Sequence, residues 1–216
     1  MQVYNEIASE WEKSRKTPFS ALKFFLPKIQ PGDRALDAGC GNGRNLVEIA
    51  RGCKEAYGID SSFEMLKYAR QRLLDSDAKN ACVVDGQIQK IPFSASFFDE
   101  IACIAALHHL IPKEQPQAIL EFSRTLKKGG LLFVSVWSEN QSGGKKEASI
   151  EWKVPGGIGR GRYYYFFKKG ELEGLLEGKG FEIMDSFYEK DGKKVPLEKS
   201  QNLVVFARKL GKVEAI

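Results

Sequence analysis

The sequence predicts an α/β protein with a mostly parallel β-sheet. From Arg34 onward, short apolar runs rich in β-forming residues alternate with segments whose apolar residues recur at intervals of three and four. The 216 residues, of which 43% are hydrophobic and 28% charged, are typical of a globular chain and exclude a disordered or collagen-like one. The sequence contains no internal repeat, so residues 1–216 are expected to form one domain.

Seven segments are expected to form the strands and four to form the helices between them. The strands cover residues 35–36, 56–59, 81–84, 100–104, 131–136, 181–187 and 203–207. The helices cover residues 45–50, 63–74, 117–126 and 171–177. Ser61 or Ser62 and Pro116 suit helix starts, and the glycines Gly52, Gly129 and Gly180 suit helix ends.

Two segments lie outside this alternation. Residues 3–14 and 19–26 have the pattern of amphipathic helices, and we expect residues 1–33 to form a helical cap over the sheet edge or the mouth of a site. Residues 138–161 contain six glycines and several basic side chains, which predicts an extended loop. Loops of this length in a compact domain are usually functional or disordered, so residues 138–168 are predicted to form a substrate-facing insertion.

Composition narrows the classes of function. No apolar run approaches the roughly 20 residues needed to cross a bilayer, and an acidic N-terminal segment does not fit a signal peptide. The four cysteines are scattered without a Cys-x-x-Cys pair, so we expect a reducing, cytoplasmic location and no metal site. The formal charge of +5, from 33 Lys and Arg against 28 Asp and Glu, favours a polyanionic partner, although a solvated surface gives the same charge.

A glycine-rich run follows the first predicted strand and opens the first predicted helix of the alternation. It reads Asp37-Ala38-Gly39-Cys40-Gly41-Asn42-Gly43. Glycines let a backbone pass close beneath a ligand and tolerate positive φ. Asp60 follows the second predicted strand, 17 positions beyond Gly43, where its carboxylate can accept both hydroxyls of a ribose. The combination indicates a nucleoside-binding site.

The spacing of the glycines decides between two kinds of nucleoside ligand. A dinucleotide site needs Gly-x-Gly-x-x-Gly, but the third glycine position is Arg44 when counted from Gly39 and Leu46 when counted from Gly41. The pattern instead matches S-adenosylmethionine. Asp37 suits the methionine ammonium group, and a ligand without phosphates requires no anion cradle at the helix start.

With these motifs in order, residues 34–208 resemble the class I S-adenosylmethionine-dependent methyltransferases. The resemblance implies a Rossmann-like, seven-stranded, mostly parallel sheet with flanking helices and an antiparallel last strand. It also implies where the cofactor binds: the methionine part at Asp37 and the run from Gly39 to Gly43, the ribose at Asp60 with Ser61 beside it, and the adenine at Asp85, Gly86 and Gln87. A turn acid before Gly86 is the alternative interpretation of Asp85.

Four further segments resemble the tRNA methyltransferases that esterify a carboxymethyl group on wobble uridine, including the methyltransferase domain of animal AlkB-homologue fusions. The segments are Val3-Tyr4-Asn5-Glu6-Ile7-Ala8 with Ser14-Arg15 and Pro18-Phe19, Ile104 to His109, Val136-Trp137 with Glu139-Asn140-Gln141, and Arg162-Tyr163-Tyr164 leading into Phe167 to Leu172. The resemblance implies a tRNA anticodon loop as substrate and a small zinc-binding activator subunit as partner. The chain has Tyr165 where these relatives usually have histidine.

The chemistry of this reaction suggests which side chains act on the acceptor. A carboxylate is already anionic at neutral pH, so it needs orientation rather than a strong base, and the arginine fork orients a carboxylate well. Arg15 and Arg162 are the candidates, with a solvated charge or a phosphate contact as alternatives. We expect His109 to face the pocket as an orienting group and one tyrosine, such as Tyr163, to stack on an unpaired base, unless the tyrosines only pack on the core.

Trp137 and Asn140 are also expected to line the pocket, unless Trp137 is a core residue. The strand at residues 81–84 carries apolar side chains that would lie at an exposed sheet edge in need of cover, which is where an activator would bind. Two other functions stay open. One is methylation of a small molecule or quinone, and the other is a cofactor-binding regulatory subunit without catalysis.

Overall fold

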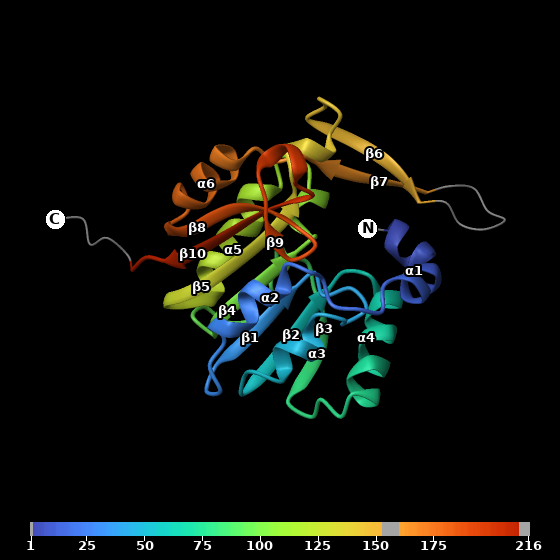
Figure 1. Ribbon diagram of the computed structural model, residues 1–216. Coiled ribbons are helices and arrows are strands. Elements are labelled where there is room, and N and C mark those ends of the chain that lie inside the picture. Colours follow the sequence, from blue (N-terminus) through green and yellow to red (C-terminus); the bar gives the residue numbers. More distant parts are fainter. Residues whose placement is uncertain (1, 153–159, 212–216) are drawn as a thin grey trace.

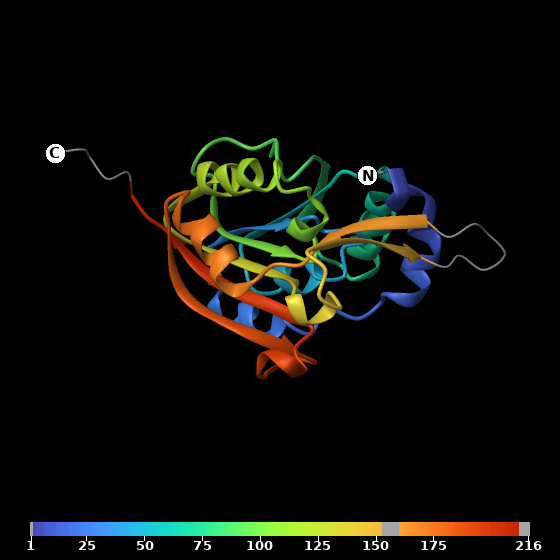
Figure 2. The same cartoon turned by 90° about the horizontal axis from the view of Figure 1, so that it is seen from above.

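The computed structural model describes residues 2–152 and 160–211 and shows one large mixed sheet with helices on both faces (Figures 1 and 2). The eight strands lie in the order β3-β2-β1-β4-β5-β10-β8-β9. They are β1 Arg34–Ala38, β2 Glu55–Asp60, β3 Ala81–Asp85, β4 Phe98–Ile104, β5 Leu126–Trp137, β8 Phe181–Lys190, β9 Lys193–Lys194 and β10 Asn202–Lys209.

The pairing of the strands confirms the predicted Rossmann-like topology. Strands β3, β2, β1, β4 and β5 run parallel, and β10 inserts antiparallel between β5 and β8. The two-residue strand β9 adds an eighth strand that the sequence pattern did not indicate. Because five parallel strands end at one edge of the sheet, the loops after β1, β2, β3 and β4 meet there.

The helices divide between the two faces of the sheet. On one face lie α2 Leu22–Phe25, the 3₁₀ turn Leu26–Lys28 and α3 Leu46–Ala50, with the C-terminal part of α4 Phe63–Asp75. The other face is covered by α5 Gln115–Thr125, which packs on β5, and by α6 Lys169–Glu177, which packs on β8 and β10. Each face therefore has its own continuous apolar core. Figure 2 shows the sheet between these two helical layers.

The N-terminal helix α1 Gln2–Ser14 does not cover a face of the sheet. It packs against α4 and against a separate two-stranded sheet, at the edge where the parallel strands end (Figure 1). The role of residues 1–33 as a cap over a site stays a prediction, and α1 lies at one of the two places expected for it. The second predicted helix is wrong in length, because only Leu22–Phe25 is α-helical and its Leu22 and Phe25 are buried on the sheet.

The predicted loop at residues 138–161 is wrong for most of its length. After the 3₁₀ turn Glu139–Gln141, residues Glu147–Trp152 form β6 and residues Arg160–Tyr165 form β7, and the two strands pair antiparallel as a ribbon. Residues 153–159 of this prediction lie outside the described residues. Half-exposed side chains alternate with exposed ones along β6, so the strand has no apolar run to reveal it.

Gly129 was also predicted wrongly as a helix end. Helix α5 stops at Thr125, and β5 begins at the next residue, so that Gly129, with a φ of +78°, lies within β5. Among residues 2–152 and 160–211, none of the helices combines the length and the apolar character that a membrane span requires.

Candidate active site

A pocket of about 310 Å³ opens where β1, β2, β3 and β4 end. Its walls come from the loops after these strands, from α1, and from β7. Most residues that the sequence analysis singled out line it: Gly39, Cys40, Gly41, Asn42, Asp60, Ser61, Gly86, Gln87, His109, Arg162 and Tyr163. Gly43 and Asp85 are the chain neighbours of lining residues, Asp37 lies two positions before Gly39 without lining the pocket itself, and Arg15 is exposed outside the pocket.

The glycine run passes over the end of the sheet in a conformation that suits glycine. Gly39 has a φ of +82°, and a Cβ atom on it would lie 2.4 Å from the Cβ of Ala106. Gly43 has a φ of +76° and approaches the backbone of Ala69 on α4, where an added Cβ would lie 3.1 Å from the Cα. Side chains at these positions would strain the backbone and force the loop away from Ala106, which follows β4, and from α4.

Asp60 fastens this loop to the end of β2. One carboxylate oxygen accepts a hydrogen bond of 2.8 Å from the backbone N–H of Gly41, and the other accepts one of 2.8 Å from the backbone N–H of Ser62. Burial raises the pKa of Asp60, while these backbone donors oppose that shift. Each oxygen keeps a second lone pair, so Asp60 can still accept a hydroxyl from a ligand in the pocket.

Asp37 is a buried carboxylate without a partner. It lies on β1, is 1% exposed, and neither side-chain oxygen has a hydrogen-bond partner among the described residues. Burial, with a smaller contribution from the charge of Asp60, raises the pKa of Asp37 to about 7. A buried carboxylate held this way is costly unless a cation pairs with it. The residue therefore fits a ligand that carries a positive charge.

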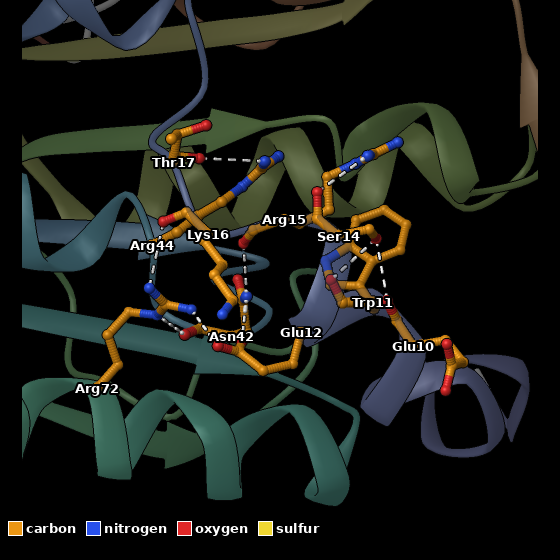
Figure 3. A network of polar contacts seen from close by, with 10 residues as sticks. All are labelled: Glu10, Trp11, Glu12, Ser14, Arg15, Lys16, Thr17, Asn42, Arg44 and Arg72. Carbon is orange, nitrogen blue, oxygen red and sulfur yellow. Dashed lines mark hydrogen bonds and ion pairs between the residues drawn. The ribbon is translucent and has the colours of Figure 1, made fainter.

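Helix α1 is joined to the glycine run by a polar network (Figure 3). The side-chain amide of Asn42 donates to the carboxylate of Glu12 at 2.5 Å and to the backbone oxygen of Arg15 at 2.9 Å. Arg72 on α4 donates to the backbone oxygen of Asn42 at 3.0 Å and to the other oxygen of Glu12 at 2.5 Å. Asn42 and Arg72 together hold the end of α1 over the pocket.

His109 is held between two partners, which fixes its tautomer. Its Nδ1 lies 2.7 Å from the backbone oxygen of Tyr163, and its Nε2 lies 2.7 Å from the hydroxyl of Tyr4. A carbonyl can only accept, so Nδ1 carries the proton and Nε2 accepts from Tyr4. Burial lowers the pKa of His109 to about 4. His109 is therefore neutral with both nitrogens bonded, as befits an orienting group rather than a base.

His108 has the opposite tautomer. Its Nδ1 accepts a hydrogen bond of 3.0 Å from the backbone N–H of Trp137, so its proton lies on Nε2. Burial and the neighbouring His109 lower the pKa of His108 well below its usual value. Its ring packs 5.2 Å from Tyr164 and 5.9 Å from Trp137. His108 is thus the structural member of the histidine pair.

Arg162 is a buried cation that lines the pocket. It is 8% exposed, its Nε has no hydrogen-bond partner, and no carboxylate of the described residues forms an ion pair with its guanidinium group. The guanidinium carbon lies 5.5 Å, 5.0 Å and 5.1 Å from the ring centres of Trp11, Trp152 and Tyr164. Aromatic faces hold such a cation without neutralising it. Arg162 therefore remains available to an anion.

The triple-tyrosine segment of β7 is mainly part of the core. Tyr164 is 2% exposed and stacks on Trp137 at 4.3 Å, and Tyr165 packs on Phe167 and donates its hydroxyl to Glu171. The substitution at Tyr165 relative to the resembled family therefore lies outside the pocket lining. Tyr163 lines the pocket, but its hydroxyl donates to Glu147 on β6.

Asn140 does not line the pocket, contrary to expectation, and of the two interpretations of Trp137 the core residue is the correct one. Trp137 stacks on Tyr164, and Asn140 donates to the backbone oxygen of Ser200 at 2.9 Å, outside the pocket lining. In their place the structure brings Tyr4 and Trp11 of α1 to the wall. Sequence reasoning missed both as site residues, although the motif containing Tyr4 had been singled out.

The comparisons with known proteins agree with this geometry. Residues 36–134 match the methyltransferase-domain family. A tRNA (carboxymethyluridine(34)-5-O)-methyltransferase of Schizosaccharomyces pombe is 28% identical over 92% of this chain and 95% of its own length. The alkbh8 enzyme of the same name from Xenopus tropicalis is 32% identical over 65% of this chain, which corresponds to only 21% of that protein.

Solved structures share the fold. An S-adenosylmethionine-dependent methyltransferase from Clostridium acetobutylicum superposes with a TM-score of 0.77 at 17% identity, covering 97% of this chain and 100% of that one. A Haloferax volcanii methyltransferase solved with the Trm112 methyltransferase activator superposes with a TM-score of 0.76 at 16% identity, covering 96% and 98%.

The chain is a class I S-adenosylmethionine-dependent methyltransferase. Its cofactor is S-adenosylmethionine, a cationic ligand without phosphates. The pocket fits that ligand, because an unpaired buried carboxylate at Asp37 lies next to a loop of closely packed glycines. Among the residues that the structure describes, no group of three or more His, Cys, Asp or Glu side chains could hold a metal ion.

We predict that Asp37→Asn weakens S-adenosylmethionine binding by at least ~100-fold, because a buried carboxylate and a cation are worth several kcal/mol as a pair. The same change should not destabilise the cofactor-free protein at pH 8. The pKa of Asp37 in the folded chain, about 7, lies above its value in the unfolded chain. The free energy of unfolding therefore decreases as the pH rises from the unfolded pKa toward 7. Asparagine does not ionise, so the variant does not show this decrease. Titration calorimetry and thermal unfolding measure the two effects.

The matched control is Asp77→Asn, since Asp77 is exposed and has a φ of +50°, which asparagine tolerates. It should change neither quantity. Unaltered cofactor affinity in Asp37→Asn would remove Asp37 from the binding site.

We also predict that the two histidines occupy opposite tautomers from pH 6 to 8, His109 protonated at Nδ1 and His108 at Nε2. Their lowered pKa values keep both neutral in this range, so the rate of methyl transfer should show no imidazole titration. Long-range ¹H–¹⁵N NMR measures the tautomers directly, and the chain has only two histidines to assign. Titration of either ring near its usual pKa of roughly 6.5 would contradict the assignment.

Proposed function

We propose that this enzyme esterifies the carboxymethyl group of a wobble uridine in tRNA, converting 5-carboxymethyluridine into its methyl ester. The observation that carries the proposal is Arg162, a buried guanidinium group in the pocket without a carboxylate partner among the described residues. A buried unpaired cation is costly unless an anion joins it. The printed names of the relatives from Schizosaccharomyces pombe and Xenopus tropicalis supply the particular acceptor.

The arrangement of the pocket agrees with a carboxylate as acceptor. A carboxylate is anionic at neutral pH and needs no base to remove a proton. His109 is neutral and hydrogen-bonded at both nitrogens, and the Tyr4 hydroxyl donates a hydrogen bond to His109, so neither is free to act as a base. Arg162 has a planar fork of donors, of which Nε is unpartnered, and can bind and orient a carboxylate. Hydroxyl or carbon acceptors would need a base in addition.

The cofactor roles follow from the same placement. S-adenosylmethionine, when bound, would supply an electrophilic methyl group on a sulfonium sulfur; the carboxylate oxygen would form the new O–CH3 bond as the S–CH3 bond breaks, with S-adenosylhomocysteine as the leaving group and product. We assign the methionine ammonium to Asp37 and the loop of residues 39–43, where the buried carboxylate lacks a partner. Asp60 with Ser61 would bind the ribose hydroxyls. Gly86 and Gln87 line the pocket after β3 and, with the neighbouring carboxylate of Asp85, would bind the adenine.

The tRNA anticodon loop is the proposed macromolecular substrate. Arg15 lies outside the pocket, exposed beside Trp11 and Trp152, where a guanidinium group can contact a phosphate of an entering strand. The net charge of +5 favours such a polyanion. Binding of tRNA should consequently weaken steeply as salt rises.

A small zinc-binding activator subunit is the proposed protein partner. The Haloferax volcanii methyltransferase of similar fold was solved with the activator Trm112. In this chain β3 is an outer strand of the sheet, as expected, and its Cys82 is exposed. Co-expression with an activator of this type should yield a co-purifying complex. Solubility and activity that are indifferent to the subunit would remove the partner.

The proposed function predicts the effect of removing Arg162. Arg162→Met should lower kcat/KM for tRNA by at least ~100-fold, because a buried charged contact to the acceptor is lost, while S-adenosylmethionine affinity stays within about two-fold. Arg162→Lys keeps the charge but not the fork and should recover only part of the activity. The assay incubates each variant with cofactor and tRNA from a strain that lacks the ester, followed by nucleoside mass spectrometry.

Arg51→Met is the matched control, because Arg51 is exposed and pairs with Glu48 on the surface. It should leave the reaction unchanged. Absence of the ester nucleoside with the wild-type protein would contradict the proposed acceptor. Turnover of a small carboxylate instead would favour the small-molecule alternative, and cofactor binding without any turnover would favour a regulatory role.

A further inference from the structure

Trp11 is a pocket-lining side chain that none of the cofactor roles uses. It lies on α1, is half-buried, and forms part of the pocket wall. Tyr4 meets its ring edge-on at 5.7 Å and 81°, and Trp152 of β6 packs against it at 5.2 Å and 40°. The indole is therefore held in place by contacts from two different elements.

Two arginines confine the Trp11–Trp152 pair further. The buried Arg162 lies 5.5 Å from the ring centre of Trp11, and the exposed Arg15 lies 5.5 Å from the same ring. Both arginines also contact Trp152, at 5.6 Å for Arg15 and 5.0 Å for Arg162. The pair thus stands between a cation inside the pocket and a cation at its rim. Figure 3 shows Trp11 beside Arg15 at the end of α1.

The other aromatic side chains near Arg162 are engaged in other contacts. Tyr4 donates to His109, Tyr163 donates to Glu147, and Tyr164 is buried against Trp137. The stacking of a base on one of these tyrosines, which the sequence suggested, therefore has little support from their contacts. Trp11 combines a large π surface, a place in the pocket wall and a fixed orientation.

We infer that Trp11 is the stacking platform for a planar heteroaromatic acceptor whose carboxymethyl arm reaches Arg162, with Trp152 as a positioning residue behind it. The inference rests on the proposed function and narrows it. In 5-carboxymethyluridine a single methylene joins ring and carboxylate, so a ring on Trp11 presents its arm to the cation beside it. Stacking needs an unpaired base, which the loop of the RNA would supply. The indole would supply the stacking surface, and because its orientation is already fixed, little conformational entropy is lost on binding.

The test compares Trp11→Leu and Trp11→Phe on an RNA stem-loop that carries 5-carboxymethyluridine in its loop. Trp11→Leu should raise KM about ten-fold, the size of a lost base–aromatic contact, with a smaller change in kcat and S-adenosylmethionine affinity within about two-fold. Trp11→Phe should recover most of the loss because it keeps a π face. Phe63→Leu is the matched control, since Phe63 is 57% exposed on α4 and should have no effect.

A second experiment tests stacking on Trp11 independently of whether RNA is the substrate. It uses two small ligands, free 5-carboxymethyluridine and a linear aliphatic carboxylate of similar size. The nucleoside should quench tryptophan fluorescence in the cofactor-loaded wild-type protein but not in Trp11→Leu. The aliphatic acid should quench the fluorescence of neither protein. If no RNA is methylated but this difference persists, the RNA substrate falls and the stacking inference stands. An unchanged KM in Trp11→Leu, or equal binding of the two carboxylates, overturns the inference.

Discussion

The attachment of α1 to the glycine run through Asn42 is the interaction on which the active site depends. Asn42 is buried, and both donors of its amide are used, one by the carboxylate of Glu12 and one by the backbone of Arg15. Since a buried amide left without partners costs roughly 1–3 kcal/mol, the contact holds the helix and the loop in one arrangement. The loop that would bind the cofactor therefore also sets the position of the helix that forms the acceptor wall.

The consequences of this attachment extend along α1. Tyr4 can bond to His109 only while the helix lies on the pocket, and that bond fixes the imidazole tautomer. Asn5 accepts from Ser62 and from the backbone N–H of Glu64, so the same helix also supports the first turn of α4. Loss of the hydrogen bonds of Asn42 to Glu12 and Arg15 would therefore weaken the contacts of α1 with His109 and with the start of α4 together.

The electrostatic design of the pocket rests on two buried groups of opposite charge. Asp37 and Arg162 lack ionic partners among the described residues, and the structure records no ion pair between them. Paired with each other they would neutralise the pocket, whereas apart they leave a buried carboxylate near the glycine run and a buried cation on β7. The charge of Arg44, which lines the pocket beside the glycine run, opposes the rise in the pKa of Asp37 but forms no ion pair with it among the described residues. A cationic cofactor and an anionic acceptor are together complementary to this division.

The parts of the structure that are local in sequence could be predicted. The alternation of strands and helices, the glycine spacing and Asp60 after the second strand each depend on short-range pattern, and they led directly to the sheet and to the glycine run that lines the pocket. The ribbon of β6 and β7 was missed because its strands alternate between half-exposed and exposed side chains without an apolar run. Long-range contacts could not be predicted either, since Tyr4 and His109 are 105 residues apart.

The isolation of the Asp37 carboxylate links cofactor supply to the lifetime of the protein. Without a bound cation, Asp37 is buried with no ionic partner among the described residues and its pKa is raised to about 7, so a cationic ligand both fills the pocket and stabilises the folded chain. Cellular proteases act on the population that is transiently open. A fall in the S-adenosylmethionine concentration would therefore reduce the amount of enzyme as well as its occupancy, and the methylation capacity of the cell would decline more steeply than its methyl donor.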